Sequence, residues 1–194
     1  MKTFRVLFYK SKIGDGHWID NAISLWTMLF NWGTKNYSHT EIWMPLVDGR
    51  FEQVSNNPSE IPFRQWLGQC FTSTMRDDID GTVIRPAADI LKHPKRWDYC
   101  QGQADDELYE KAVRWAKEKV KRNRGYGKKT ILRFFMPIWL FKALRLEEKD
   151  REICSENAEG FLLIVKWICK KMFRSPRRLS RKLITKGYQI TPLA

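Results

Sequence analysis

Two Asp-Gly pairs, each set between short runs of β-branched and aromatic residues, constrain how the middle of this chain can fold. Asp48-Gly49 separates residues 38–44 from residues 50–55, and RDDIDG joins QCFTSTM to DGTVIRP. Asp-Gly adopts the conformation that tight hairpin turns need, so both places predict antiparallel strand pairs. The run TFRVLFY at residues 3–9 predicts another strand. The centre of the fold is therefore expected to be an antiparallel sheet.

Helical spacing of apolar residues occurs on both sides of this region. Residues 19–30 predict one helix, and ADDELYEKAVRWAKEKVKRN predicts a second, with Asp105 as its cap and an apolar face made of Leu108, Ala112, Trp115 and Val120. A third helix is expected from about Cys154 to Met172, and a fourth begins at Ser175-Pro176. With 194 residues, we expect an α+β fold in a single domain, residues 1–194.

The charge is strongly basic and unevenly distributed. The chain holds 35 Lys and Arg against 22 Asp and Glu, a formal net charge of +13. The excess is concentrated in residues 111–133 and 166–186. An anionic contact through these segments is expected, and nucleic acid, anionic lipid and acidic glycopolymer are all compatible with it. A solvated basic surface without a dedicated partner explains the same charge.

Four cysteines and three histidines provide few ways to bind a metal. The cysteines stand at 70, 100, 154 and 169 without a CxxC pair, so we expect neither a metal site nor a cofactor. The N-terminus lacks a signal-peptide pattern, and charges and Pro137 interrupt the apolar stretch 131–144, so no membrane span is expected. These features predict a cytoplasmic protein with free thiols.

Cys154 stands where a helix begins, and the free amides and positive dipole of a helix start favour a thiolate. A nucleophilic thiol needs a base, and His39 in the strand YSHTEIW is the candidate, with Glu41 on the same face two residues later. Core packing explains a cysteine at this position as well. The residue that orients His39 stays open among Glu41, Glu52, Gln53, Thr72 and Ser73. The remaining cysteines are interpreted as structural, and His17 and His93 as loop residues.

Several motifs, taken in order, resemble a known family. SHTEIW, CFTSTMRDDIDGTVIR, KRWDY, YG followed by ILRFFMPIW, and ICSENAEGFLL resemble the circularly permuted branch of the papain-like amidases related to NlpC-type cell-wall peptidases. The resemblance covers roughly residues 33 to 165 and depends on motif order as much as on any one motif. His39 precedes Cys154, as the permutation requires.

The resemblance implies a permuted papain-like fold in which the nucleophile lies at a helix N-terminus. Cys154 would attack a carbonyl in a peptide or cell-wall amide, and His39 would take and return the proton. Glu41 also matches the motif as the third catalytic residue. Two departures bear on the substrate pocket: NNPSEIPFRQWLG is an apparent insertion, and CFTST is less serine-rich than the family run.

Two other functions are compatible with the sequence. Lecithin retinol acyltransferase-like proteins share the permuted core and act on lipid esters, and the aromatic and basic stretch 128–146 would suit a lipid-like acyl substrate. A non-catalytic basic module that binds nucleic acid or a host protein is the other alternative. A wall-acting type of enzyme without a signal peptide would fit a phage-encoded protein, or one delivered to a host.

Overall fold

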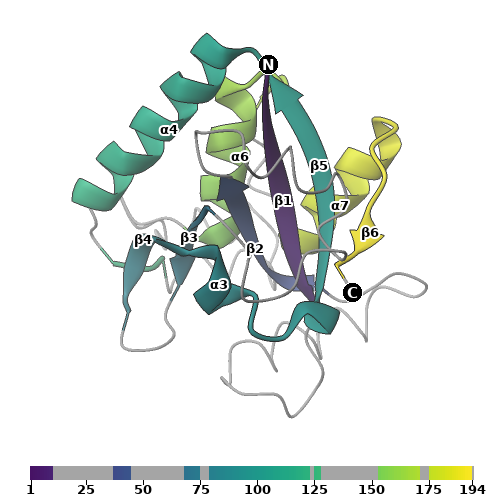
Figure 1. Ribbon diagram of the computed structural model, residues 1–194, viewed down its shortest axis with the longest axis horizontal. Helices are drawn as coiled ribbons and strands as arrows, with labels where there is room; N and C mark the ends of the chain where they lie inside the picture. Colours follow the sequence, from purple (N-terminus) through teal and green to yellow (C-terminus); the bar gives the residue numbers. More distant parts are fainter. Residues whose placement is uncertain are drawn as a thin grey trace, which may run out of the picture.

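The architecture is an antiparallel sheet covered by helices. The computed structural model describes residues 1–10, 37–44, 68–74, 79–122, 125–127, 153–170 and 175–193. Within them the six strands follow the order β4-β3-β2-β1-β5-β6, and every neighbouring pair is antiparallel (Figure 1). The strands are β1 (Lys2–Lys10), β2 (Tyr37–Met44), β3 (Gln69–Thr74), β4 (Gly81–Pro86), β5 (Trp97–Ala104) and β6 (Thr191–Pro192).

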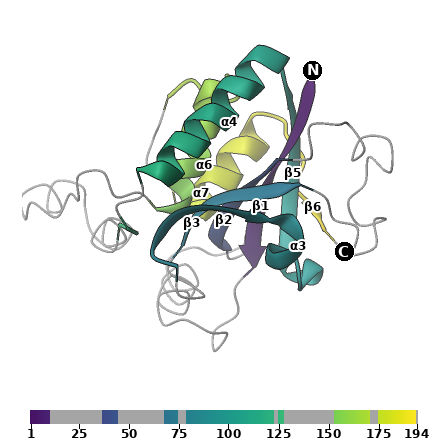
Figure 2. The same ribbon diagram turned by 60° about the vertical axis from the view of Figure 1, so that its left-hand side comes forward.

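The longer helices pack on one face of this sheet. They are α4 (Asp106–Lys121), α6 (Cys154–Ile164) and α7 (Pro176–Thr185), whereas the short α3 (Ala87–Ile90) lies on the other face (Figure 2). A short 3-10 helix, η3 (Pro94–Arg96), precedes β5. The expected α+β class is confirmed. Within the described ranges, no helix is long and apolar enough to cross a bilayer.

Both faces of the central strand β1 are buried. Phe4, Val6 and Phe8 join the core beneath α4, α6 and α7, while Leu7 belongs to a second core with α3. Because neighbouring side chains of a strand point to opposite faces, a strand buried on both sides needs an almost continuous apolar run. This requirement explains why β1 reads as TFRVLFY rather than as a strict alternation.

Several expectations are confirmed in detail. The strand predicted at 38–44 is β2, and QCFTSTM and DGTVIRP pair as β3 and β4 up to Thr74 and Gly81. Gly81 has a φ of 122°, a conformation that suits glycine. Ser175 caps α7 by accepting a hydrogen bond from the N–H of Arg178 (3.3 Å), and Pro176 is its first residue.

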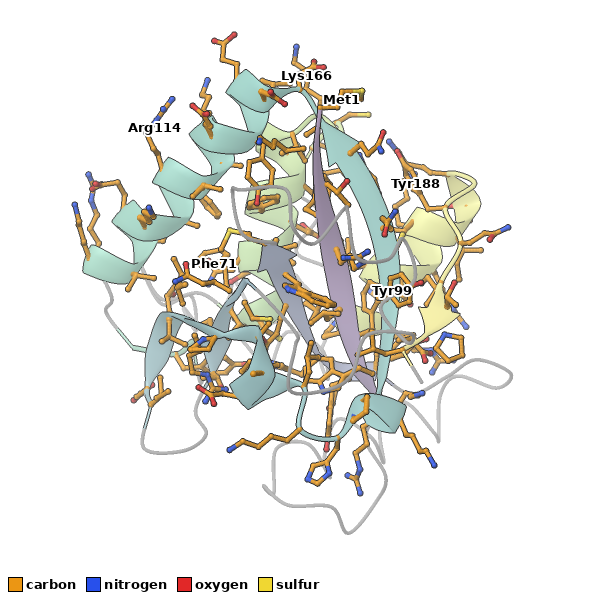
Figure 3. All side chains as sticks on the ribbon, viewed as in Figure 1. Met1, Phe71, Tyr99, Arg114, Lys166 and Tyr188 are labelled. Carbon is orange, nitrogen blue, oxygen red and sulfur yellow. The ribbon has the colours of Figure 1, made fainter. Side chains whose placement is uncertain are left out.

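The second predicted helix is α4, with two differences. Asp105 occupies the N-cap position, but its side chain accepts no capping hydrogen bond. The buried stripe is Tyr109, Ala112 and Ala116, whereas the other residues predicted to face the core are only partly buried. Arg114 lies on the outer side of this helix (Figure 3).

Strand β5 was not predicted, although it pairs with β1 from Trp97 to Ala104. Its sequence, WDYCQGQA, is more polar than a buried strand usually is. The buried Asp98 is compensated by the hydroxyl of Tyr37, which donates to its Oδ2 (2.5 Å), and by Lys10, 2.8 Å from Oδ1. Burial of the Tyr37 side chain and the negative charge of Asp98 raise the pKa of Tyr37.

The helix that begins at Cys154 is shorter than expected, since it ends at Ile164 rather than near Met172. The N–H of Trp167 donates to Leu162 O (2.9 Å) and that of Lys166 to Leu163 O (3.1 Å), which is a Schellman turn. Lys166 takes the left-handed position, with a φ of 60°. The turn directs Trp167 onto β1, where its ring lies 4.8 Å from that of Phe4.

Other expectations fall outside the described residues. These are the helix at 19–30, the strand at 50–55, most of the apparent insertion, residues 56–67, and the aromatic stretch 131–144.

Substituting Gly102 tests the close approach of Trp167 to β5. A Cβ at Gly102 would lie 1.9 Å from Trp167 Cζ2, so we expect Gly102→Ala to lower the free energy of unfolding by about 1–3 kcal/mol, as overpacking typically does. Urea unfolding measures this change. In a Trp167→Ala background the penalty should largely disappear. An equal penalty in both backgrounds would show that overlap with this ring is not the cause.

Candidate active site

The site lies where β2 and β3 stop pairing. The two strands pair over three positions, Ile42 with Phe71, Trp43 with Cys70 and Met44 with Gln69. Both strands extend further, since β2 begins at Tyr37 and β3 continues to Thr74. Beyond the ladder, the Thr72 hydroxyl donates to Thr40 O (3.2 Å) and so links the two strands through a side chain. The divergence brings side chains of both strands together around His39.

His39 is held through one ring nitrogen. Its Nε2 lies 3.2 Å from Glu41 Oε1 and 3.1 Å from Thr72 Oγ1. Because the Glu41 carboxylate can only accept a hydrogen bond, Nε2 carries the proton. In the neutral ring Nδ1 is then the acceptor, which is the tautomer that a general base needs.

Cys154 is the first residue of α6, and Figure 1 shows this helix passing behind β2. Glu156 accepts a hydrogen bond from the N–H of Ile153 (3.1 Å), and Asn157 Nδ2 donates to Thr82 Oγ1 on β4 (3.2 Å). These bonds fix the start of the helix and its position over the sheet.

The first backbone donors of α6 are left for another acceptor. The N-cap residue is Ile153, whose side chain has no oxygen, and Ile153 O accepts from the N–H groups of Glu156 and Asn157. The N–H groups of Cys154 and Ser155 are therefore the uncapped donors of the first turn. They lie at the positive end of the helix dipole, beside the thiol.

The thiol and the imidazole form one electrostatic unit. Burial alone would lower the pKa of His39, but the negative charge of the Cys154 thiolate, a hydrogen bond with it and the Glu41 carboxylate together raise that pKa to about 9. His39 is 6% exposed, Cys154 3% and Glu41 2%, so solvent screens their interactions weakly. The surroundings of His39 therefore favour its protonated form.

An aromatic surface adjoins His39. The Trp97 ring lies 6.5 Å from the imidazole in an edge arrangement, and the Tyr9 ring lies 5.1 Å from that of Trp97. Arg96 donates to the Tyr9 hydroxyl (2.9 Å). On the central strand β1, Tyr9 pairs with His39 of β2 on one side and with Trp97 of β5 on the other. Strand β1 therefore sets the spacing between His39 and the aromatic rings.

The other cysteines have different surroundings. Burial and the negative charge of Glu41 raise the pKa of Cys70 despite the opposing charge of Arg85. Burial raises the pKa of Cys100 to about 12. Both thiols thus stay protonated at neutral pH, and Cys169 is exposed. Cys154 is the cysteine that the structure brings to a histidine.

The structure brings several of the predicted site residues together. Glu41 and Thr72 both contact His39, whereas Glu52, Gln53 and His17 lie outside the described residues. His93 is exposed before η3. Sequence reasoning missed Trp97 as a neighbour of His39, because it did not recognise β5. The alternation of Trp97 and Tyr99 with Asp98 and Cys100 is the signal that could have revealed this strand.

Metal binding receives no support from the parts of the chain described here, where no group of three or more His, Cys, Asp or Glu side chains could hold an ion. Comparisons with models of protein families, with curated proteins and with solved structures found no match.

Titration of His39 by NMR tests its coupling to Cys154. In the wild type we expect the ring to lose its proton at a pH of about 9. Cys154→Ala removes the charge and the hydrogen bond that raise this pKa, so the midpoint should fall. His39→Gln assigns the resonance among the three histidines. A midpoint that Cys154→Ala leaves unchanged would contradict the coupling.

Proposed function

We propose that this protein is a cysteine hydrolase of the circularly permuted papain-like type, cleaving an amide bond in a peptide or cell-wall stem. The observation that carries the proposal is the position of Cys154 at the start of α6, where its thiol interacts with His39, the ring that Glu41 and Thr72 hold. Among the other cysteines, Cys70 and Cys100 are buried and have raised pKa values, and Cys169 is exposed. A buried pair of the kind that Cys154 and His39 form is what an activated nucleophile requires.

The first half of the reaction forms an acyl-enzyme. Cys154 Sγ bonds to the carbonyl carbon, and the carbonyl electron pair moves onto oxygen. The N–H groups of Cys154 and Ser155 are the donors available to this oxyanion. The C–N bond then breaks as the leaving nitrogen takes the proton of His39. A thioester and a free amine result, and His39 is neutral.

The second half returns the enzyme to its starting state. Water gives a proton to Nδ1 of His39 and adds its oxygen to the thioester carbon. The new tetrahedral intermediate expels Cys154 as a thiolate and releases a carboxylic acid. Glu41 and Thr72 hold Nε2 throughout, which keeps the ring oriented and stabilises its charged form.

Amide cleavage rests on the motif resemblance as well as on the geometry. The order of His39 before Cys154 and the start of a helix at CSE match the permuted arrangement. The lipid-ester alternative depended on residues 128–146, and all of the aromatic residues there fall outside the described ranges. Among the described residues of the candidate site, no feature favours a lipid ester over an amide.

Alkylation of Cys154 by iodoacetamide is the first test. At about pH 6 an ordinary thiol of pKa ~8.5 is almost wholly protonated. An ion-paired Cys154 should therefore react faster than the exposed Cys169. His39→Ala should slow the alkylation of Cys154 roughly ten- to a hundred-fold. Mass spectrometry of the digested protein gives the rate at each cysteine. Equal rates in the wild type and in His39→Ala would refute activation by His39.

A matched pair of substrates distinguishes amide cleavage from ester cleavage. Acyl-enzyme formation from a nitroanilide and a nitrophenyl ester of the same acyl group is followed by the mass of the Cys154 peptide, with Cys154→Ala as the blank. Acylation by the ester alone, across a series of acyl groups, would contradict amide cleavage.

A second pair of variants identifies the residue that supports the imidazolium. Glu41→Gln removes a charge that raises the pKa of His39, so alkylation at about pH 6 should slow by roughly ten-fold, the effect of one pKa unit. Thr72→Val keeps the shape and loses only a neutral hydrogen bond, so its effect should be smaller. The opposite order would assign the supporting role to Thr72.

A further inference from the structure

The C-terminal part of the chain is rich in cations and contains no acidic residue. From Gly160 onward the sequence has nine Lys and Arg and no Asp or Glu. We define the basic end patch by the cations of this region that are exposed or partly exposed along α7 and after α6. They are Lys166, Lys170, Arg178, Arg181, Lys182 and Lys186.

The fold joins the two halves of this patch. Lys186, at the end of α7, donates to Trp167 O (2.9 Å) and lies 4.0 Å from Cys169 Sγ. The Schellman turn exposes Lys166 while it buries Trp167 and Ile168. Lys166 and Lys186 therefore lie at the end of α6 opposite to Cys154, and Figure 3 shows Lys166 at the same end of the molecule as Met1.

Apolar side chains accompany these cations. Among the described residues, the large hydrophobic side chains that are exposed are Met1, Leu163 and Ile184, and two of them adjoin the patch. Leu163 is 36% exposed one turn before Lys166, and Ile184 is 55% exposed one turn after Arg181. Cations interspersed with aliphatic groups suit a lipid headgroup layer, where charge meets phosphate and aliphatic groups contact acyl chains.

Nucleic acid fits the patch less well. Proteins that bind single strands usually offer aromatic faces on which bases stack. The nearby aromatic rings are Trp167 and Tyr188, and they stack on each other with centroids 4.0 Å apart and planes at 9°. Trp167 is also buried, and its Nε1 donates to Gln103 O. The faces that stack on each other are not available to a base without disrupting this packing.

The other cationic helix provides a contrast. Helix α4 has five basic and four acidic residues, and Arg114 and Lys121 pair with Glu110 and Glu118 at 3.9 and 3.3 Å. Its local field is therefore nearly neutral, whereas no acidic side chain is present in the segment that carries the basic end patch. We propose that the basic end patch docks the protein on a membrane leaflet that exposes anionic lipid headgroups.

Vesicle flotation with matched charge variants tests this proposal. The probes are vesicles of phosphatidylcholine alone and of phosphatidylcholine mixed with phosphatidylglycerol. The patch variant is Lys166→Gln, Lys170→Gln and Lys182→Gln, and the control is Lys111→Gln, Lys117→Gln and Arg122→Gln. Each removes three exposed or partly exposed cations and takes the formal charge from +13 to +10. Thermal unfolding of both variants verifies that the fold is retained.

We expect binding to the anionic vesicles that weakens with salt and little binding to phosphatidylcholine alone. Each neutralised cation should cost about five-fold in affinity, so the patch variant should bind about a hundred-fold more weakly than the control. Ile184→Asn should weaken binding further. Equal losses in the patch and control variants, or no flotation of the wild type, would overturn the proposal. So would a single-stranded oligonucleotide that binds the patch more tightly than vesicles at equal phosphate concentration.

Discussion

The two-sided burial of β1 is the constraint on which the rest of the structure depends. This strand pairs with β2 on one edge and β5 on the other, and its side chains enter both cores. Because a one-residue slip would exchange the two faces, the apolar pattern of β1 fixes its register against both neighbours. His39 and Trp97 are then placed opposite the same residue, Tyr9.

The candidate site lies where the regular pairing of the strands ends. Strand β2 follows β1 closely but leaves β3 beyond Ile42, and the backbone pairing gives way to contacts between side chains. Thr72 both links the strands and contacts Nε2 of His39. A strand that is rigid on one edge and open on the other can hold a base firmly while leaving room for a second element to approach.

Much of this arrangement could be predicted from local patterns. The strand pair on either side of RDDIDG, the apolar run of β1 and the Ser175-Pro176 start of α7 were predicted from local signals, and each is confirmed. The predictions failed where contacts between residues far apart in the sequence determine the local structure. Asp98 can be buried in β5 only because Tyr37 and Lys10 reach it, and α6 ends early where Trp167 packs on β1.

The candidate site, too, could be predicted only in part from local sequence. The i, i+2 spacing of His39 and Glu41 indicated a shared face, and their contact is observed. The role of Thr72 was one of several alternatives, because choosing among them requires the point at which β2 and β3 diverge. Local sequence does not encode that point.

The order of these elements along the chain bears on when a reactive thiol can exist. Strands β1 to β5 all precede α6, so His39 and its partners are synthesised well before Cys154. During synthesis a sheet could assemble around a base that has no thiol to activate. Docking of α6, anchored by Asn157 to β4, then brings Cys154 to His39. Under the proposed function, the nucleophile would be activated only at the end of folding, and a nascent chain would carry no activated thiol.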